Sequence, residues 1–198
     1  MPLLFKPGSS PFGQTIPHWV VGWWKWLLSI PRDNSPAFDL SGINAASNQT
    51  HPHVFYLCQT WETADTFPKR KVAIPRGRCV FMPIINWLSF SDANRNIDDQ
   101  QMDTITRNRI DAVSHLEVRL DDEVICDPLL GLRSRSPFFD FSLPSNNIFG
   151  LSSGRRRGIS DGYWLFTYPL EQDIRLSTFG ACSSGINKIG IKYDIKLI

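Results

Sequence analysis

The sequence contains no apolar run long enough to cross a membrane and carries almost no net charge. Its most apolar stretch, residues 16–30, is interrupted by His18 and Lys25, and it is shorter than the about 20 residues that a transmembrane helix needs. The formal net charge of +2 over 198 residues argues against nucleic acid or a membrane surface as the partner. Residues 1–13 lack the long apolar core of a signal peptide. We therefore expect a cytoplasmic protein, or an exported one whose signal has been removed.

Motifs for metal binding and for nucleophilic catalysis are also missing. The four cysteines, at positions 58, 79, 126 and 182, have no CxxC spacing and no histidine at zinc-finger distance, which excludes the common structural zinc modules. No GxSxG nucleophile elbow occurs, so no catalytic residue is assigned. We expect no cofactor, and we interpret Cys58, Cys79 and Cys126 as small buried side chains of strands.

Tryptophan, in contrast, is concentrated in one segment. Four of the seven Trp residues lie between Thr15 and Pro31, which are residue types that begin and end helices. Wound as a helix, the segment is apolar around most of its circumference, with one polar stripe through His18, Gly22 and Lys25. The pattern predicts a helix buried on several sides, with its indoles in the core. The alternative is that exposed indoles stack on a sugar or another flat ligand.

The rest of the chain is typical of a mainly β protein. Apolar runs at residues 53–59, 78–85 and 163–168 predict strands covered on both faces, and Pro83 places the end of the second strand at a sheet edge or a bulge. The alternation at residues 116–126 predicts a hairpin with its turn at Asp121 and Asp122. The alternation at residues 189–197 predicts a strand with one face in the core and the other in solvent. Residues 98–114 have an amphipathic helical pattern, whereas residues 32–52 and 127–160 are rich in loop-forming residues.

These elements together predict the fold class. We expect a β-sandwich, of jelly-roll or immunoglobulin-like type, with a buried N-terminal Trp-rich helix and one amphipathic helix near 98–114. Residues 1–14 are expected to form an extended arm, and residues 15–198 a single domain with helical additions.

Three groups of residues resemble a family of uncharacterised bacterial proteins. They are WWKWLLSIP (23–31), the pair VFYLCQT (54–60) and IPRGRCVFMPIIN (74–86), and SDGYWLFTYPL (160–170). In the same order, they are similar to the family's WWxWxxSIP, VWFLxGT, VPxGKxxFFPIxN and DGYWxFxxPL motifs. The resemblance spans most of residues 15–197 and implies a shared fold, with no activity attached to it. Many family members look exported, whereas this chain shows no signal, and Gln59 stands where the family has glycine.

His51, His53 and Glu62 invite comparison with the metal-binding HxH and Glu arrangement of cupins. In a cupin the Glu follows the second His by four or five residues, but here those positions are Leu57 and Cys58, and Glu62 is nine residues on. A metal needs three or four converging ligands. We therefore predict no metal site and interpret the histidines as a surface pair. His51, His53 and Glu62 remain candidates for binding a ligand.

Asn86, Arg109 and Asp161 are further candidates for ligand binding. Asp161 precedes Gly162 in a predicted turn and, beside Asn86 of a neighbouring strand, could lie at the mouth of a pocket. Arg109 lies near the middle of the apolar face of the predicted helix. It either reaches the rim or pairs with a carboxylate, or it binds an anion in a cleft.

Arg155, Arg156 and Arg157, in the segment GRRRG, are candidates for anion binding together with the segment Arg133–Arg135. Guanidinium groups bind phosphate and carboxylate bidentately. The other interpretation of these residues is a pair of solvated, flexible loops.

The sequence favours a non-enzymatic protein that acts by binding or assembly, because it combines an aromatic core with no recognisable catalytic set. The alternative is a small-ligand-binding protein or a hydrolase-type enzyme with a loop-lined pocket near His51, His53, Glu62, Asn86 and Asp161. Those side chains would then lie within about 8 Å of one another. A third hypothesis is a structural subunit, with self-association or a protein partner contacted through residues 1–14 and the loops.

Overall fold

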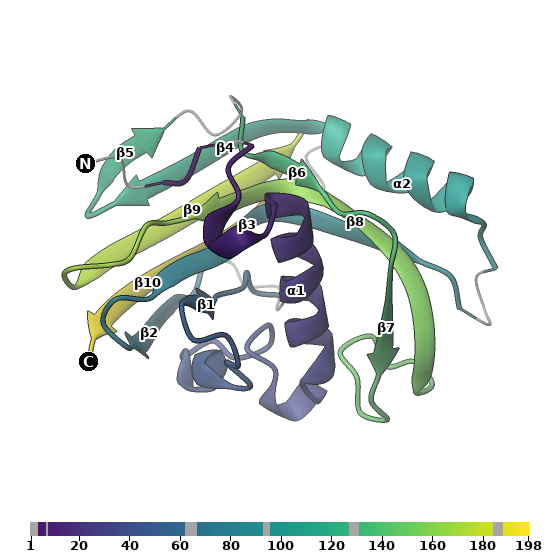
Figure 1. Ribbon diagram of the computed structural model, residues 1–198, viewed down its shortest axis with the longest axis horizontal. Helices are drawn as coiled ribbons and strands as arrows, with labels where there is room; N and C mark the ends of the chain where they lie inside the picture. The colour runs from purple at the N-terminus through teal and green to yellow at the C-terminus, as the bar shows by residue number, and fades with distance from the viewer. Residues whose placement is uncertain (1–3, 7, 62–66, 93–95, 127–130, 184–187) are drawn as a thin grey trace.

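The described part of the chain forms two β-sheets and two α-helices. The computed structural model describes residues 4–6, 8–61, 67–92, 96–126, 131–183 and 188–198, and Figure 1 shows its ribbon. Each sheet has five strands, and the chain passes between the two sheets several times. The mainly β class and the two helices predicted from the sequence are confirmed.

The first sheet is built around two long antiparallel strands, β3 (Cys79–Phe90) and β8 (Gly154–Phe166). Its order is β1-β3-β8-β6, and β7 pairs with the other half of β8. The shorter strands are β1 (Val54–Tyr56), β6 (Arg133–Arg135) and β7 (Phe139–Leu143). Most side chains of β3 and of the second half of β8 are buried, which explains their continuous apolar sequence.

The second sheet has the order β2-β10-β9-β4-β5. Its strands are β2 (Lys69–Ile74), β4 (Val113–Leu120), β5 (Glu123–Cys126), β9 (Ile174–Cys182) and β10 (Lys188–Leu197). Along β10 the buried Ile191 and Tyr193 alternate with the exposed Lys192 and Lys196. The prediction of one wet face for this strand is confirmed.

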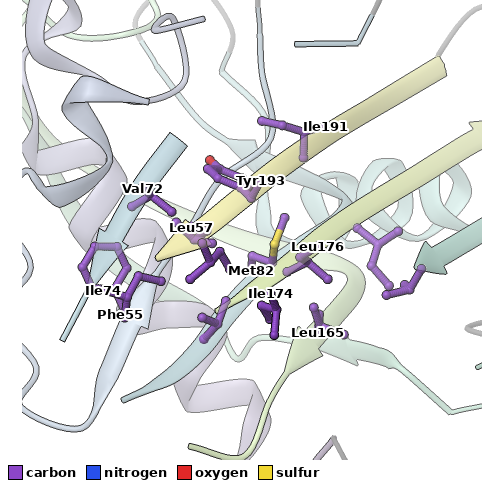
Figure 2. Close-up of a cluster of buried hydrophobic side chains, with 14 of the residues drawn as sticks. Phe55, Leu57, Val72, Ile74, Met82, Leu165, Ile174, Leu176, Ile191 and Tyr193 are labelled. Carbon is purple, nitrogen blue, oxygen red and sulfur yellow. The ribbon is translucent and has the colours of Figure 1, made fainter. Parts of the chain in front are cut away.

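The inner faces of the two sheets pack together into one hydrophobic core, part of which Figure 2 shows. The first sheet contributes Phe55, Met82 and Leu165, and the second contributes Leu176 and Ile191, each at most 2% exposed. Phe55 and Leu57 lie in this core, whereas Val54, Tyr56 and Cys58 lie in the cluster on the other face of the sheet, so the prediction that residues 53–59 are covered on both faces is confirmed.

One charged side chain, Arg70 of β2, lies inside this core with no exposed surface. Its Nη1 donates to the carbonyl oxygen of Cys58 at 3.0 Å and to the hydroxyl of Tyr193 at 2.8 Å. Burial raises the pKa of the Cys58 thiol to about 11 and raises the pKa of Tyr193 as well. Cys58 and Cys79 are both buried and unpaired, as expected; the side chain of Cys126 is outside the described set.

Helix α1 (Ile16–Ser29) covers the opposite face of the first sheet, as Figure 1 shows. Trp19, Trp23, Trp24 and Trp26 are 1%, 1%, 2% and 5% exposed. Each indole N–H donates a hydrogen bond, and the acceptors are Pro11 O, Leu57 O, Ser160 Oγ and Ser47 O. Burying about 200 Å² of ring contributes about 5 kcal/mol before entropy is counted. The indoles are therefore core, as predicted, and offer no stacking surface.

Helix α2 (Asp99–Asp111) lies against β3 and β8 and begins at a capping box of Asp98 and Gln101. Its buried side chains are Met102, Thr106 and Ile110. The predicted helix near 98–114 was too long, because Val113 already belongs to β4. Including that extra turn rotated the expected apolar face toward Arg109, which is in fact exposed.

The segment 127–160 contains three strand regions where loops were expected: β6, β7 and the first half of β8. The side chains of β6 and of the first half of β8 are largely charged or polar, so these two regions lack apolar alternation. In β7 the buried Phe139, Phe141 and Leu143 do alternate with two exposed residues, but the pattern is only five residues long and lies within a loop-rich segment. Asp161 and Gly162 form no turn and lie inside β8. The glycine is needed because a Cβ there would lie 2.7 Å from the Ile85 carbonyl oxygen on β3.

Strand β3 has a bulge between Pro83 and Ile85. The bulge confirms the prediction from Pro83, but the strand continues to Phe90 instead of ending there. At the other end of the chain, the described part of the N-terminal arm contacts its own domain: Leu4 forms a bridge with Thr167, and the Phe5 N–H donates to Phe166 O at 2.9 Å. Among the described residues, neither helix is long and apolar enough to span a bilayer.

Candidate functional site

His51 and His53 lie side by side at the start of β1, with ring centroids 6.0 Å apart. Nδ1 of His51 accepts hydrogen bonds from the backbone N–H groups of His53 and Val54 at 3.2 and 3.1 Å. Burial lowers the pKa of His51, and the neighbouring His53 and Arg78 lower it further. Glu62 lies outside the described residues, and the part of the chain that is described holds no cluster of three metal-ligating side chains. Because its Nδ1 accepts both backbone hydrogen bonds, the neutral His51 ring caps the start of β1.

Asn86 and Asp161 lie on adjacent strands but face opposite sides of the first sheet. The register pairs Asn86 with Gly162 and Asp161 with Trp87, and successive residues of a strand point to opposite faces. Asn86 thus shares the face of α1, whereas Asp161 faces α2. The histidine pair is farther away, because the carbonyl of His53 meets Cys79 and Asn86 lies seven residues along β3, roughly 23 Å. The structure does not gather these residues into one pocket.

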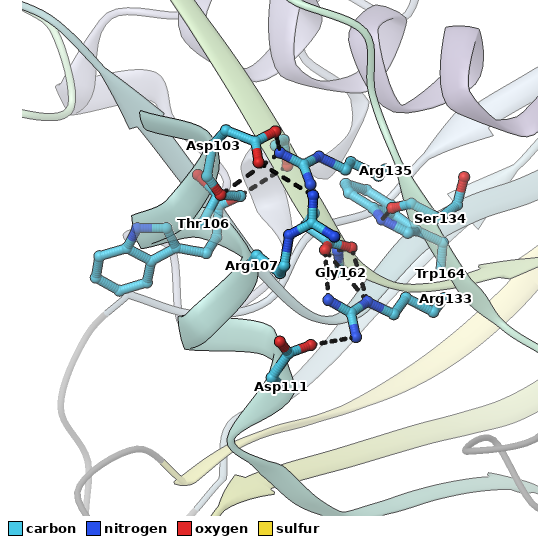
Figure 3. Close-up of polar contacts among 12 residues, drawn as sticks. Asp103, Thr106, Arg107, Asp111, Arg133, Ser134, Arg135, Gly162 and Trp164 are labelled. Atoms are coloured by element: carbon cyan, nitrogen blue, oxygen red, sulfur yellow. Dashed lines mark hydrogen bonds and ion pairs between the residues drawn. The ribbon is translucent and has the colours of Figure 1, made fainter. Parts of the chain in front are cut away.

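Asp161 belongs to an ion-pair network beneath α2, of which Figure 3 labels Arg133, Arg135, Asp103 and Asp111. The Asp161 carboxylate is 2% exposed and accepts from Arg133 Nη2 at 2.7 Å and from the Gly162 N–H at 2.8 Å. Arg133 also pairs with Asp111 of α2 at 2.6 Å, and hydrogen bonding to Asp161, with smaller contributions from Asp111, raises the pKa of Arg133. Every charge of this group has a partner within the chain, so we interpret the network as a clamp that holds α2 on the sheet.

The remaining arginines that the sequence singled out also bond within the chain. Arg155 pairs with Asp140 at 2.9 Å, and Arg157 pairs with Asp99 of α2 at 3.0 Å. Arg156 Nη2 donates to the carbonyl oxygen of Ser152 at 3.0 Å.

Arg133 and Arg135 of β6 behave in the same way, since Arg135 pairs with Asp103 of α2. The guanidinium carbon of Arg109 lies 4.6 Å from the centre of the Trp87 ring, a cation–π contact at the rim of α2. The geometry gives these arginines a role in joining elements and leaves no cluster of free guanidinium groups among them.

A groove on the outer face of the second sheet has both aromatic and charged walls. It has a volume of about 550 Å³ and crosses β4, β9 and β10. Two rows of paired residues form its floor: Glu117 and Phe179 in one, and Arg119, Ser177 and Lys192 in the next. Gly190 pairs with Phe179 at the end of the first row. A second depression of about 620 Å³ continues from it and shares Arg175 and Asp194. Both volumes are typical of ligand sites.

Phe67, which precedes β2, lies over Gly190 in this groove. A Cβ at Gly190 would lie 2.8–2.9 Å from three atoms of the Phe67 ring, so only glycine leaves room for the ring in this position. The ring is 41% exposed and its centroid lies 5.4 Å from that of Phe179. His115 follows, 5.5 Å from Phe179. One face of the Phe67 ring thus rests on the sheet while much of the residue remains in contact with solvent.

The charged walls of the groove are paired with one another. Lys69 contacts Asp194 at 2.9 Å, Arg119 contacts Glu117 at 2.6 Å and Arg175 contacts Asp122 at 3.1 Å. The lining residues comprise four cations and three carboxylates, and Lys192 is the cation for which the described residues supply no ion-pair partner. The groove is therefore polar but nearly neutral.

Sequence reasoning missed this groove, although one signal of it was present. Gly190 lies on the polar face of β10, where the other residues are Lys192, Asp194 and Lys196. A glycine inside a strand often marks the close approach of another group. Nothing in the sequence identified Phe67 as that group.

Comparison with protein-family models, with curated protein sequences and with solved structures finds no match to this chain. Its function is therefore argued from its own geometry.

Proposed function

We propose that this is a non-enzymatic binding protein and that its ligand lies in the groove on the outer face of the second sheet. The observation that carries the proposal is the Phe67 ring, which rests on Gly190 and is 41% exposed in a groove of about 550 Å³. An aromatic ring held in this way presents apolar surface at low cost in conformational entropy. The other ring-rich part of the protein, the α1 layer, is closed to ligands because its indoles are buried.

The arrangement of polar side chains supports binding in preference to catalysis. General acid–base chemistry needs titratable groups that converge on one reacting atom. In the described part of the chain, Asp161 is bonded to Arg133, His51 caps β1, and Asn86 faces the opposite side of the sheet from Asp161. The groove itself contains carboxylates that are each paired with a cation.

The finer fold assignment and the family belong to the same proposal. We infer a β-sandwich in the broad sense of two stacked sheets. The parallel pairs β1–β3 and β2–β10 set it apart from the antiparallel immunoglobulin and jelly-roll arrangements. The resemblance to the bacterial family with WWxWxxSIP motifs supports membership, since Trp23, Trp24 and Trp26 are core residues here. A structure of a family member in which these indoles are exposed would contradict it.

Nuclear magnetic resonance of the full chain tests where a ligand binds. We would titrate ¹⁵N-labelled protein with neutral linear hexasaccharides, with a twelve-nucleotide oligothymidylate, and with one acidic and one basic peptide. We expect at least one of them to shift backbone amides of β4, β9 and β10, and Phe67→Ala to raise the ligand concentration needed for those shifts about tenfold. Shifts confined to other elements, or shifts that develop at the same ligand concentration in Phe67→Ala, would overturn the proposal.

A further inference from the structure

We infer that the ligand of this groove is a neutral carbohydrate chain, an inference that rests on the proposed binding function. Three features of the groove carry it: the shape of the aromatic surface, the mutual pairing of the charges, and the continuity of the two depressions.

The aromatic surface suits the flat apolar face of a sugar ring. Phe67 lies across Gly190, with three of its ring atoms at nearly equal distance from the position that a Cβ would take. One face of the ring is therefore turned to the sheet and the other is turned away from it. Phe179 continues the aromatic surface along the same row, and the His115 ring, which belongs to the row of Ala181, lies 5.5 Å from Phe179. A face presented in this way stacks on another flat, weakly polar surface.

The paired charges suit hydroxyl groups and disfavour a charged polymer. A sugar hydroxyl both donates and accepts hydrogen bonds, so it can bridge a cationic side chain and a carboxylate that already contact each other. Arg119 with Glu117 and Lys69 with Asp194 are such pairs, with 41% and 34%, and 58% and 30%, of their side chains exposed. Nucleic acid requires an excess of cations to neutralise its phosphates, whereas the described walls of the two depressions carry six cations and five carboxylates, so their charge is nearly balanced.

The two depressions suit a chain rather than a single sugar unit. They share Arg175 and Asp194, and together they cross the sheet from Phe67 to Lys196. A peptide bound by its main chain pairs with the edge of a sheet, whereas this groove runs over a face, where the strands offer side chains only. The geometry thus favours an extended neutral glycan over a peptide.

Isothermal titration calorimetry with linear hexasaccharides of glucose, mannose and N-acetylglucosamine tests the ligand class. We expect one of them to bind and its affinity to fall about tenfold in Phe67→Ala, the loss that corresponds to one aromatic stacking contact. Gly190→Ala should cause a similar loss because its Cβ displaces the Phe67 ring. Phe12→Ala is the matched control, since Phe12 is 45% exposed and packs beside Trp19 and His53, away from the groove. Raising the salt concentration should change the affinity less than about twofold, because no phosphate is neutralised.

The outcomes separate the ligand class from the site. If oligothymidylate or a peptide binds and Phe67→Ala removes that binding, the groove is a binding site and the carbohydrate inference is overturned. If a hexasaccharide binds equally well to Phe67→Ala, Gly190→Ala and the native chain, both the inference and the proposed function fail. If no hexasaccharide binds at millimolar concentration, the inference is overturned. Circular dichroism of each variant establishes that it is folded.

Discussion

The Arg133–Asp161 pair gives the sharpest test of how α2 is held. Arg133 donates to Asp161 through Nε at 3.2 Å and through Nη2 at 2.7 Å. Replacing Arg133 with Met leaves a carboxylate that is 2% exposed with the Gly162 N–H as the remaining donor that the structure describes. Breaking one side of a buried pair costs about 3–5 kcal/mol. We take the lower end, about 3 kcal/mol, because Arg133 is 34% exposed and water will enter when it is removed.

A double-mutant cycle isolates the charge from the lost packing. Arg133→Met, Asp161→Asn and the double variant would be unfolded with urea at pH 7 and followed by tryptophan fluorescence. The double variant should recover about 2 kcal/mol relative to the sum of the two single changes, because no uncompensated charge remains. The control is Arg155→Met, which removes a pair with side chains 77% and 45% exposed and should leave the urea midpoint unchanged within error. If Arg133→Met and Arg155→Met behave alike, or if the cycle shows no coupling, the clamp interpretation is wrong.

Two further predictions concern the layer beneath α1 and the effect of high pH. Gly22→Ala should destabilise the protein by about 1 kcal/mol, because its Cβ would lie 2.8 Å from the Tyr56 hydroxyl and crowding offsets the usual gain in helix propensity. Tyr56→Phe in the same chain should reverse the loss in thermal melts, and an additive result would contradict the crowding argument. Burial raises the pKa of Tyr56 to about 12 and the pKa values of Cys58 and Cys79 to about 11. Because these native pKa values are raised, their contribution to stability is complete below about pH 8.5 and is lost as the unfolded chain deprotonates above it. The urea midpoint should be flat from pH 7 to about 8.5 and fall by pH 10.5; a flat profile to pH 10.5 would count against this burial.

Elements that are buried on more than one side were predictable from the sequence. The α1 segment and the strands around Phe55, Phe81 and Leu165 have few polar positions, because both of their surroundings are apolar. An almost entirely apolar sequence therefore indicates that both faces of such an element are covered. The alternation in β10 was also predictable, because one of its faces meets the core and the other meets water.

Elements stabilised by distant charges were not predictable. β6 and the first half of β8 carry arginines that look like solvated loop residues, and their partners Asp103 and Asp99 lie 32 and 58 residues away. Nothing local signals such pairing. The groove was hidden for a similar reason, because Phe67 reaches Gly190 only after β2 and β10 have come together.

The position of β10 has a consequence for how the chain reaches its native state. β10 lies between β2 and β9, and Lys69 pairs with Lys192, a separation of 192 − 69 = 123 residues. Such distant pairing makes folding slow. On the ribosome, β2 therefore leaves the exit tunnel long before β10 has been synthesised. Until then β2 lacks the strand with which it pairs in the native sheet. A premature stop just before β10 would leave β2 and β9 without the strand that joins them, so such fragments should be ready substrates for chaperones and proteases.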